Sequence, residues 1–328
     1  MNYGRWYGDH AAELLPDHEV TLLVPRDFEG RFGNGVRYLV ARARYRWLSG
    51  LMPKFDVWHS IHQLSPFRPS SSATRRVLTI HDVNFMYEKS PAKQRKYLRR
   101  LQRECDSASK ICFISRFAKE DATRYIHLRG KPTAVIPNGV ENLTQGEQRA
   151  PQGVAPSLPF FLSLGVVKAK KNLHTLLPLM ERMPDYQLVV AGSDKGAYAE
   201  QLRRQTEAFP NVHIIGPVDD AGRRWLYAHC SGLLFPSVCE GFGLPVIEAM
   251  QWGKPVFCSD RTSLPEVGGN HAFYFRDFDP DRMAAVVRDG LRDFTSERAE
   301  AEKAYAAGFS YERHLRAYLE ELTDDSSR

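Results

Sequence analysis

The sequence predicts an α/β protein built from two doubly wound parallel sheets. Short apolar segments alternate with helix-length segments in both halves of the chain, which is the pattern that such sheets produce. The 328 residues are enough to bury two separate cores. Residues 141–159 lie between the halves and are polar and rich in Pro and Gly, so we expect a linker there.

The expected strands are clearest in the second half, where short apolar runs end in turn-forming residues, as buried parallel strands do. These strands are residues 160–164, 187–191, 212–215, 232–235, 255–258 and 272–275. In the first half, residues 77–80 have the same pattern. After Asp279 the pattern is helical, and we expect residues 324–328 to fray at the end of the chain.

The segment after the expected strand 232–235 has the features of an anion site. A helix is predicted to start near Pro245, because proline suits the first helical turn, and Gly253 stands where a C-terminal capping glycine would fall. The N-terminus of a helix presents free backbone N–H groups that can bind phosphate. The amides expected to do so belong to Phe242, Gly243 and Leu244.

Two carboxylates flank this predicted helix start. Glu240 lies at the strand exit and Glu248 about one turn into the helix, so both can face a ligand at the carboxyl ends of the strands. Ionised carboxylates accept strong hydrogen bonds, which suits them to the vicinal diols of a sugar. A phosphate site beside two carboxylates that can bind diols predicts a nucleotide sugar as ligand. The alternative is that the glycines only form a turn and both carboxylates are solvated.

The same segment carries a family resemblance. The run P-S-V-C-E-G-F-G-L-P-V-I-E-A-M at 236–250, followed by G-K-P-V at 253–256 and L-P-E-V at 264–267, resembles the retaining glycosyltransferases of family 4, which have the GT-B fold. Further motifs similar to that family are T-I-H-D at 79–82, I-P-N-G-V at 136–140, L-G-V-V-K-A-K-K-N-L at 164–173 and L-Y-A-H-C at 226–230.

The resemblance implies two Rossmann-like domains that face each other across a cleft. It places an acceptor-side domain at 1–150, a domain that binds the nucleotide sugar at 151–308, and a terminal helix at 309–328 that crosses back to the first domain. The family opens with a strand and a glycine-rich loop, and Gly4-Arg5-Trp6 resembles the end of that loop. The first domain is therefore expected to lack its first strand, and activity is expected to be weak unless upstream residues are restored.

The resemblance also assigns roles to lysine and histidine side chains. Lys171 matches the lysine that neutralises the donor diphosphate, and Lys170 stands where one branch of the family has an arginine. Val166 occupies the position at which other members have an arginine. His81 matches the histidine that reaches the hydroxyls of the donor sugar, and Asp82 is expected to orient its loop. The alternatives are a solvated lysine loop and a structural histidine.

These matches define the predicted site. The predicted catalytic residues are His81, Lys171 and Glu240, and the predicted binding residues are Lys170, Glu248 and the three amides near the helix start. The family uses lysines and a helix N-terminus in place of a divalent cation, so we expect no metal and no cofactor. Retention usually involves an enzyme carboxylate as nucleophile. The resemblance instead implies a same-face substitution in which Glu240 holds donor hydroxyls.

Charge is divided unevenly between the two halves. Residues 1–150 carry 25 Lys and Arg against 15 Asp and Glu, net +10, whereas residues 151–328 carry 20 against 24, net −4. The densest basic clusters are Arg37–Arg46, which has interleaved aromatics, and Lys89–Arg103. Such clusters suit an anionic membrane surface or a diphosphate-linked acceptor, and the alternative is a solvated helix face. Nucleic acid is not expected, because no helix-turn-helix, zinc-finger or RNP pattern occurs.

The cysteine pattern and the lengths of the apolar runs indicate the cellular compartment of the protein. The five cysteines form no C-x-x-C pair, no apolar run approaches the roughly 18 residues of a membrane span, and the N-terminus lacks a signal-peptide core. We expect a cytoplasmic protein, peripheral on the inner face of the membrane, with its cysteines in the cores.

The predicted function is hexosyl transfer with retention, from a nucleotide diphosphate sugar to a glycan or a polyprenyl-diphosphate-linked oligosaccharide of a surface polysaccharide such as lipopolysaccharide. The K-N-L loop favours a mannose-type donor by analogy. Two alternatives stay open at this point. One is a nucleotide-sugar epimerase on the GT-B scaffold, and the other is a catalytically degenerate GT-B partner that binds without turnover.

Overall fold

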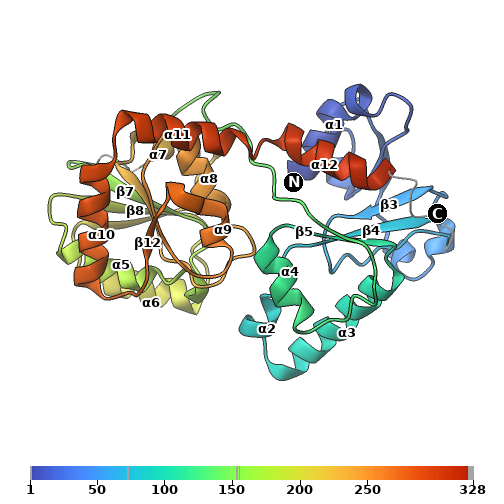
Figure 1. Ribbon diagram of the computed structural model, residues 1–328, viewed down its shortest axis with the longest axis horizontal. Coiled ribbons are helices and arrows are strands. Elements are labelled where there is room, and N and C mark those ends of the chain that lie inside the picture. The colour runs from blue at the N-terminus through green and yellow to red at the C-terminus, as the bar shows by residue number, and fades with distance from the viewer. Residues whose placement is uncertain (1, 72–73, 153, 155, 324–328) are drawn as a thin grey trace. The chain divides into compact units, whose positions relative to one another are not determined.

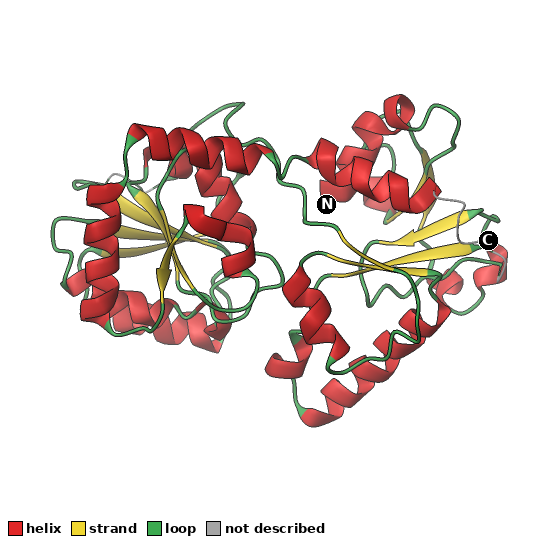
Figure 2. Cartoon of the chain, viewed as in Figure 1, coloured by secondary structure: helices red, strands yellow, loops and turns green. Residues whose placement is uncertain are grey.

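The computed structural model describes residues 2–71, 74–152, 154 and 156–323, and the chain divides into two compact units. Unit 1 comprises residues 1–141 and 311–328, and unit 2 comprises residues 142–310. Each unit consists of parallel strands with helices packed against them (Figures 1 and 2). The α/β class predicted from the alternation of strands and helices is therefore confirmed.

Unit 2 is built on one six-stranded parallel sheet with the order β12-β11-β10-β7-β8-β9. Its strands are β7 (Phe160–Leu164), β8 (Gln187–Ala191), β9 (Val212–Gly216), β10 (Gly232–Phe235), β11 (Val256–Ser259) and β12 (Phe273–Phe275). Its α-helices are α5 (Leu176–Glu181), α6 (Ala197–Thr206), α7 (Asp220–His229), α8 (Leu244–Gln251), α9 (Leu264–Gly268), α10 (Pro280–Asp293) and α11 (Ser296–Ala307). Each expected strand of this half is present, with ends that differ by one residue at most.

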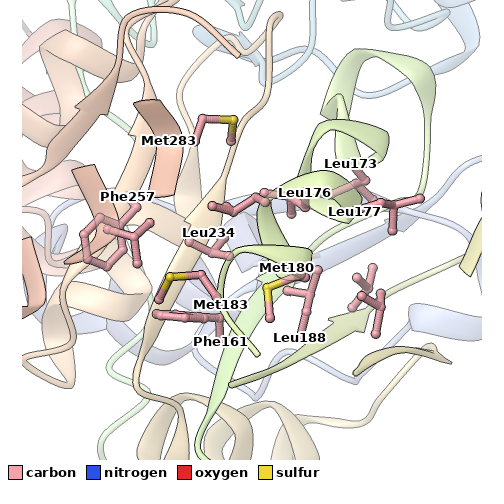
Figure 3. Close-up of a cluster of buried hydrophobic side chains, with 14 of the residues drawn as sticks. Phe161, Leu173, Leu176, Leu177, Met180, Met183, Leu188, Leu234, Phe257 and Met283 are labelled. Carbon is pink, nitrogen blue, oxygen red and sulfur yellow. The ribbon is translucent and has the colours of Figure 1, made fainter. Parts of the chain in front are cut away.

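The core of unit 2 lies between the sheet and the helices α5 and α10, where Leu, Met and Phe side chains interdigitate (Figure 3). Phe161 of β7, Leu234 of β10 and Phe257 of β11 point into this layer and are fully buried. The facing side chains include Leu176 of α5 and Met283 of α10. Burial of this layer fixes the positions of the strand ends, which carry the loops of the candidate site.

Unit 1 contains a two-stranded sheet, β1-β2, and a four-stranded sheet, β3-β4-β5-β6, with all pairs parallel. Its strands are β1 (Thr21–Val24), β2 (Arg37–Val40), β3 (Val57–Ser60), β4 (Arg75–Ile80), β5 (Lys110–Phe113) and β6 (Thr133–Val135). Its α-helices are α1 (Asn2–Leu14), α2 (Phe85–Glu88), α3 (Pro91–Ser107), α4 (Arg116–Thr123) and α12 (Tyr311–Thr323). The first described element of the unit is the helix α1.

The C-terminal helix α12 belongs to unit 1. Its Leu315 and Leu319 pack with Tyr7 and Leu15 at the first helix. The Tyr318 hydroxyl lies 2.8 Å from Thr79 Oγ1 of β4, so the helix is also tied to the four-stranded sheet. The expected frayed residues 324–328 lie outside the described part of the chain.

The domain boundary lies earlier than the predicted residue 150, because the start of the linker packs on unit 2. Leu143 is fully buried, and its amide donates to Gln251 Oε1 of unit 2 over 3.1 Å. Arg149 pairs with Asp219 over 2.5 Å. The polar composition predicts the linker but not the anchoring of its first residues to one side.

The expectation that the cysteines lie in the cores holds for four of the five, since Cys239 is only partly buried. All five cysteines are free, and Cys105, Cys112, Cys230 and Cys258 are buried. Among the described residues, no helix combines the length and the apolar character needed to cross a bilayer.

Candidate active site

The strand order of unit 2 places a topological switch point between β7 and β10. From β7 the chain proceeds to β8 and β9 on one side, and then returns to β10 on the other side. In open α/β sheets, ligands bind outside the carboxyl ends of the strands at such a point. The two loops that leave β7 and β10 carry Lys171 and Glu240, so the topology brings together two of the predicted residues.

The loop after β7 is shaped by two glycines. Gly165 has φ +139° and Gly192, which follows β8, has φ +140°. A Cβ on Gly192 would lie 2.0 Å from the carbonyl oxygen of Gly165, so only glycine permits this approach. At Gly165 a Cβ would lie 3.4 Å from Lys171 Nζ. The close backbone contact therefore fixes the loop, and the lysine side chain folds back over the strand end.

Lys171 and Glu240 form an ion pair. Lys171 Nζ lies 2.6 Å from Glu240 Oε1, and their side chains are only 13% and 12% exposed. The ammonium group also lies 4.5 Å above the centre of the Phe235 ring. A largely desolvated, hydrogen-bonded pair is held more rigidly than an exposed one. The geometry therefore presents an oriented cation and an oriented carboxylate at the switch point.

Hydroxyl groups hold the backbone and side chain of Glu240. Ser237 Oγ lies 2.6 Å from Glu240 Oε1, the amide of Glu240 donates to Thr262 Oγ1 over 3.1 Å, and Ser263 Oγ donates to the carbonyl of Glu240 over 3.0 Å. In the described chain, the side-chain contacts of Glu240 all fall on Oε1, which leaves Oε2 available to a ligand hydroxyl. These three residues were not predicted from the sequence, where their only signal is that they lie in or beside the matched motifs.

Lys170 contributes its backbone to the site. Its carbonyl oxygen accepts from the amide of Val238 over 2.8 Å and lies 3.0 Å from Ser237 Oγ. The two loops are therefore joined to each other through the main chain. Asn172 has φ +57°, so short 3₁₀ turns follow the loop and the helix α5 starts at Leu176. The left-handed Asn172 therefore separates the two 3₁₀ turns that precede α5.

The start of helix α8 agrees with the prediction. Pro245 lies in its first turn, and Gly253, with φ +59°, follows its C-cap. Gly243 has φ +103°, and a Cβ there would lie 2.6 Å from Leu264 Cδ2. Among the described residues, the amides of Phe242 and Gly243 donate no hydrogen bond to another residue. Phe242 is 4% exposed as a whole residue, so its ring packs in the interior.

Glu248 lies one turn into α8, and its carboxylate is buried and oriented by a neighbouring helix. Tyr227 Oη of α7 donates to Glu248 Oε2 over 2.8 Å, and Arg223 Nη1 lies 3.5 Å from Oε1. Burial, followed by the charge of Glu248, raises the pKa of Tyr227 well above its ordinary value, so this hydroxyl stays a donor. Tyr227 lies in the L-Y-A-H-C motif, but the motif alone did not predict this role.

His81 belongs to unit 1, where it follows strand β4. Its Nε2 donates to the carbonyl of Ile61 over 2.7 Å, which assigns the proton to that nitrogen because a carbonyl only accepts. Burial is the main cause that lowers the pKa of His81, so the ring is held neutral. Gln63 fixes the loop, since it accepts from the amide of His81 and donates to the carbonyl of Asp82. Gln63 is also a residue that the sequence analysis missed.

Family models match both parts of the chain. Residues 144–307 match the model described as glycosyl transferases group 1, and residues 5–142 match the model described as glycosyltransferase family 4. The chain belongs to this glycosyltransferase family. The resemblance inferred from the motifs is therefore confirmed.

The curated relatives of this family 4 chain include bacterial mannosyltransferases. It is 29% identical over 243 residues to the O-antigen chain mannosyltransferase B of Escherichia coli, with 67% of this chain and 62% of that protein covered. It is 24% identical to the O-antigen chain mannosyltransferase RfbU of Salmonella typhimurium, over 65% of this chain and 60% of that protein. The chain spans less than two thirds of the length of these relatives.

Solved structures confirm the GT-B fold. A glycosyltransferase of Rickettsia africae has a TM-score of 0.74 at 16% identity, with 99% of this chain and 95% of that chain covered. Anabaena HepE, solved in complex with UDP and glucose, has a TM-score of 0.73 at 16% identity, with 98% and 95% covered.

Proposed function

We propose that this family 4 chain transfers a mannose-type hexose, with retention, from a nucleotide diphosphate sugar to a lipid-linked glycan of a surface polysaccharide. The observation that carries the proposal is the ion pair of Lys171 and Glu240 at the switch point of unit 2. The mannose-type donor is supported by the similarity to two O-antigen chain mannosyltransferases.

Each group has a distinct task in the proposed reaction. Lys171 and the amides at the start of α8 stabilise the negative charge that grows on the departing diphosphate. Glu240 accepts hydrogen bonds from donor-sugar hydroxyls through Oε2, and Glu248 does the same for a diol of the nucleotide. The bond from the anomeric carbon to the diphosphate oxygen breaks, the acceptor oxygen bonds to the same face, and the acceptor proton passes to the leaving diphosphate.

The first test is the binding of UDP, GDP, ADP and dTDP, measured by calorimetric titration of the wild type. One diphosphate is expected to bind, and Glu248→Gln should weaken its binding by about tenfold, since one charged hydrogen bond is replaced by a weaker one. Glu300→Gln, on the exposed surface of α11, is the matched control and should bind as the wild type does. Binding of no diphosphate contradicts the proposal.

The second test is transfer from the corresponding nucleotide diphosphate mannose to a lipid-linked acceptor. Lys171→Ala is expected to lower kcat at least about a hundredfold, because it removes a preorganised contact to growing charge. Lys168→Ala, an exposed lysine of the same loop, is the control. An anomeric configuration in the product opposite to that of the donor would contradict retention. Donor binding without any transfer would favour a non-catalytic partner.

A further inference from the structure

An unusually exposed apolar segment follows strand β2 in unit 1, and we define it as the Arg42–Lys54 segment. Trp47 is 88% exposed, Leu48 59% and Leu51 56%, although such side chains are normally covered. The segment leads into β3 and is blue in Figure 1. Three large apolar side chains within five residues form a patch rather than scattered exposure.

The segment is held firmly, so its exposure is a property of the fold. Tyr45 and Met52 are buried and anchor it on the body of unit 1. The backbone forms two 3₁₀ turns, Ala43–Arg46 and Ser49–Leu51. The amides of Trp47, Leu48 and Leu51 donate to carbonyls inside the segment over 2.8–3.1 Å. An element with internally bonded amides can enter an apolar phase without leaving those polar groups unsatisfied.

Cationic residues flank the exposed apolar side chains in the chain. Arg42, Arg44, Arg46 and Lys54 are exposed, and none of them forms an ion pair with a carboxylate in the described part of the chain. No Asp or Glu occurs between residues 30 and 55. The Arg44 guanidinium lies over the Tyr45 ring and that of Arg46 over the Phe67 ring. The positive charge is therefore uncompensated and is fixed beside the apolar side chains.

The second basic cluster, on helix α3, has a different structure. Its Tyr97, Leu98 and Leu101 pack toward the core of unit 1, while Lys93 and Lys96 are exposed. This helix therefore has a solvated charged face without an exposed apolar patch. Of the two basic clusters seen in the sequence, only the Arg42–Lys54 segment combines charge with exposed Trp and Leu.

We propose that the Arg42–Lys54 segment docks this protein on an anionic lipid bilayer, with Trp47, Leu48 and Leu51 inserted at the interface and the flanking cations against the headgroups. Tryptophan prefers the membrane–water interface, and apolar insertion combined with basic residues gives reversible binding to anionic membranes. The inference rests on the proposed function, since an enzyme that acts on a lipid-linked acceptor must work at a bilayer surface.

The test is co-sedimentation of the full chain with vesicles of equal parts phosphatidylglycerol and phosphatidylethanolamine, and with vesicles of phosphatidylcholine alone. The wild type should bind the anionic vesicles, and binding should weaken as salt is added. The combined variant Trp47→Ser, Leu48→Ser, Leu51→Ser should bind at least about a hundredfold more weakly, because it loses three inserted side chains. Its thermal unfolding should match that of the wild type, since these side chains are exposed.

Charge is tested with matched variants in unit 1. Replacing Arg42, Arg44 and Arg46 by Gln should weaken binding by about a hundredfold, at roughly 1 kcal/mol for each cation near the surface. The same change at Lys93, Arg95 and Lys96 removes equal charge from α3. This control should weaken vesicle binding by less than about fivefold. Equal losses from the two charge variants, or unchanged binding by the serine variant, would overturn the inference.

Three further measurements separate the outcomes. Lipid binding should shift the tryptophan emission of the wild type to the blue, and Trp47→Phe should remove the shift. Sedimentation velocity without lipid should show the same mass for the wild type and the serine variant; a dimer that this variant dissociates would mean that a second copy covers the patch. Titration of the same preparations with nucleoside diphosphate tests the proposed function independently. A loss of nucleotide binding can therefore be distinguished from a loss of lipid binding.

Discussion

The buried carboxyl group of Glu302 on α11 should make unit 2 less stable as the pH rises. Its side chain is fully buried, and both carboxyl oxygens lack a hydrogen-bond partner in the described chain. The nearest cation is Arg298, whose Nε lies 3.8 Å away and whose guanidinium stacks on the Phe273 ring at 4.1 Å. Burial outweighs this cation and raises the pKa of Glu302 from 4.5 to about 8.

The sign follows from proton binding in the two states. Between about pH 4.5 and pH 8 the folded chain keeps the Glu302 proton while the unfolded chain releases it, so the free energy of unfolding falls as the pH rises. Below this window both states are protonated and there is no loss. At 1.36 kcal/mol per pKa unit the full loss is about 5 kcal/mol, which is an upper value because local relaxation and water entry reduce it.

The perturbation is Glu302→Gln, which keeps the shape and removes the ionisation. Urea unfolding of the variant and the wild type should give similar free energies near pH 5 and a variant that is several kcal/mol more stable near pH 9. Glu300→Gln, whose side chain is 71% exposed on the same helix, should show no such trend. A difference between Glu302→Gln and the wild type that does not change with pH refutes the reasoning.

Four further predictions concern the site. Gly192→Ala should lower the free energy of unfolding by more than about 3 kcal/mol, because its Cβ would meet the carbonyl of Gly165. The control Gly50→Ala, with open space around it, should lower it by less than about 1 kcal/mol. Equal losses of melting temperature in the two variants would contradict this reason. Ser237→Ala should lower kcat roughly tenfold with little change in stability, since it loosens one oxygen of Glu240, and an unchanged kcat would contradict that positioning role. Glu240→Gln should retain measurable transfer that azide does not rescue; recovery by azide with an inverted glycosyl azide as product would identify Glu240 as a nucleophile instead. A chelator of divalent cations should leave the initial rate of transfer unchanged, and a loss of more than about tenfold would contradict metal independence.

The sequence predicts the strands of unit 2 well, because each is a short apolar run bounded by turn residues and parallel strands are buried on both faces. The order of these strands within the sheet is harder to predict from the sequence. The pairing of β10 with β7 depends on which crossover the chain makes, and no local pattern encodes it. Glu240 was predicted from its place at a strand exit and Lys171 from the family resemblance, while their ion pair was found only in the structure.

The hydrogen-bond partners of the predicted residues could not be predicted from the sequence. Tyr227 lies 21 residues before Glu248, and Gln63 lies 18 residues before His81, so neither pair has a periodic signal. A buried polar side chain must find a hydrogen-bond partner, but which one it finds depends on the packing of separate helices and loops. Local conformation can be hidden in the same way, because Asn172 is left-handed although the other residues of the K-K-N-L run are good helix formers.

The arrangement around Glu240 favours a residue that holds hydroxyl groups over one that attacks carbon. Lys171 and Ser237 both contact Oε1, so the negative charge of the carboxylate is drawn toward that oxygen and away from the ligand side. A nucleophilic carboxylate needs its electron density directed at the anomeric carbon, whereas a hydrogen-bond acceptor needs only a lone pair of fixed direction, which Oε2 retains. The same contact leaves the Lys171 ammonium with donors for a diphosphate, because one of its three hydrogens is used by Glu240. One ion pair therefore orients both an acceptor for hydroxyls and a donor for phosphate, and the switch point of the sheet brings the two loops close enough for it to form.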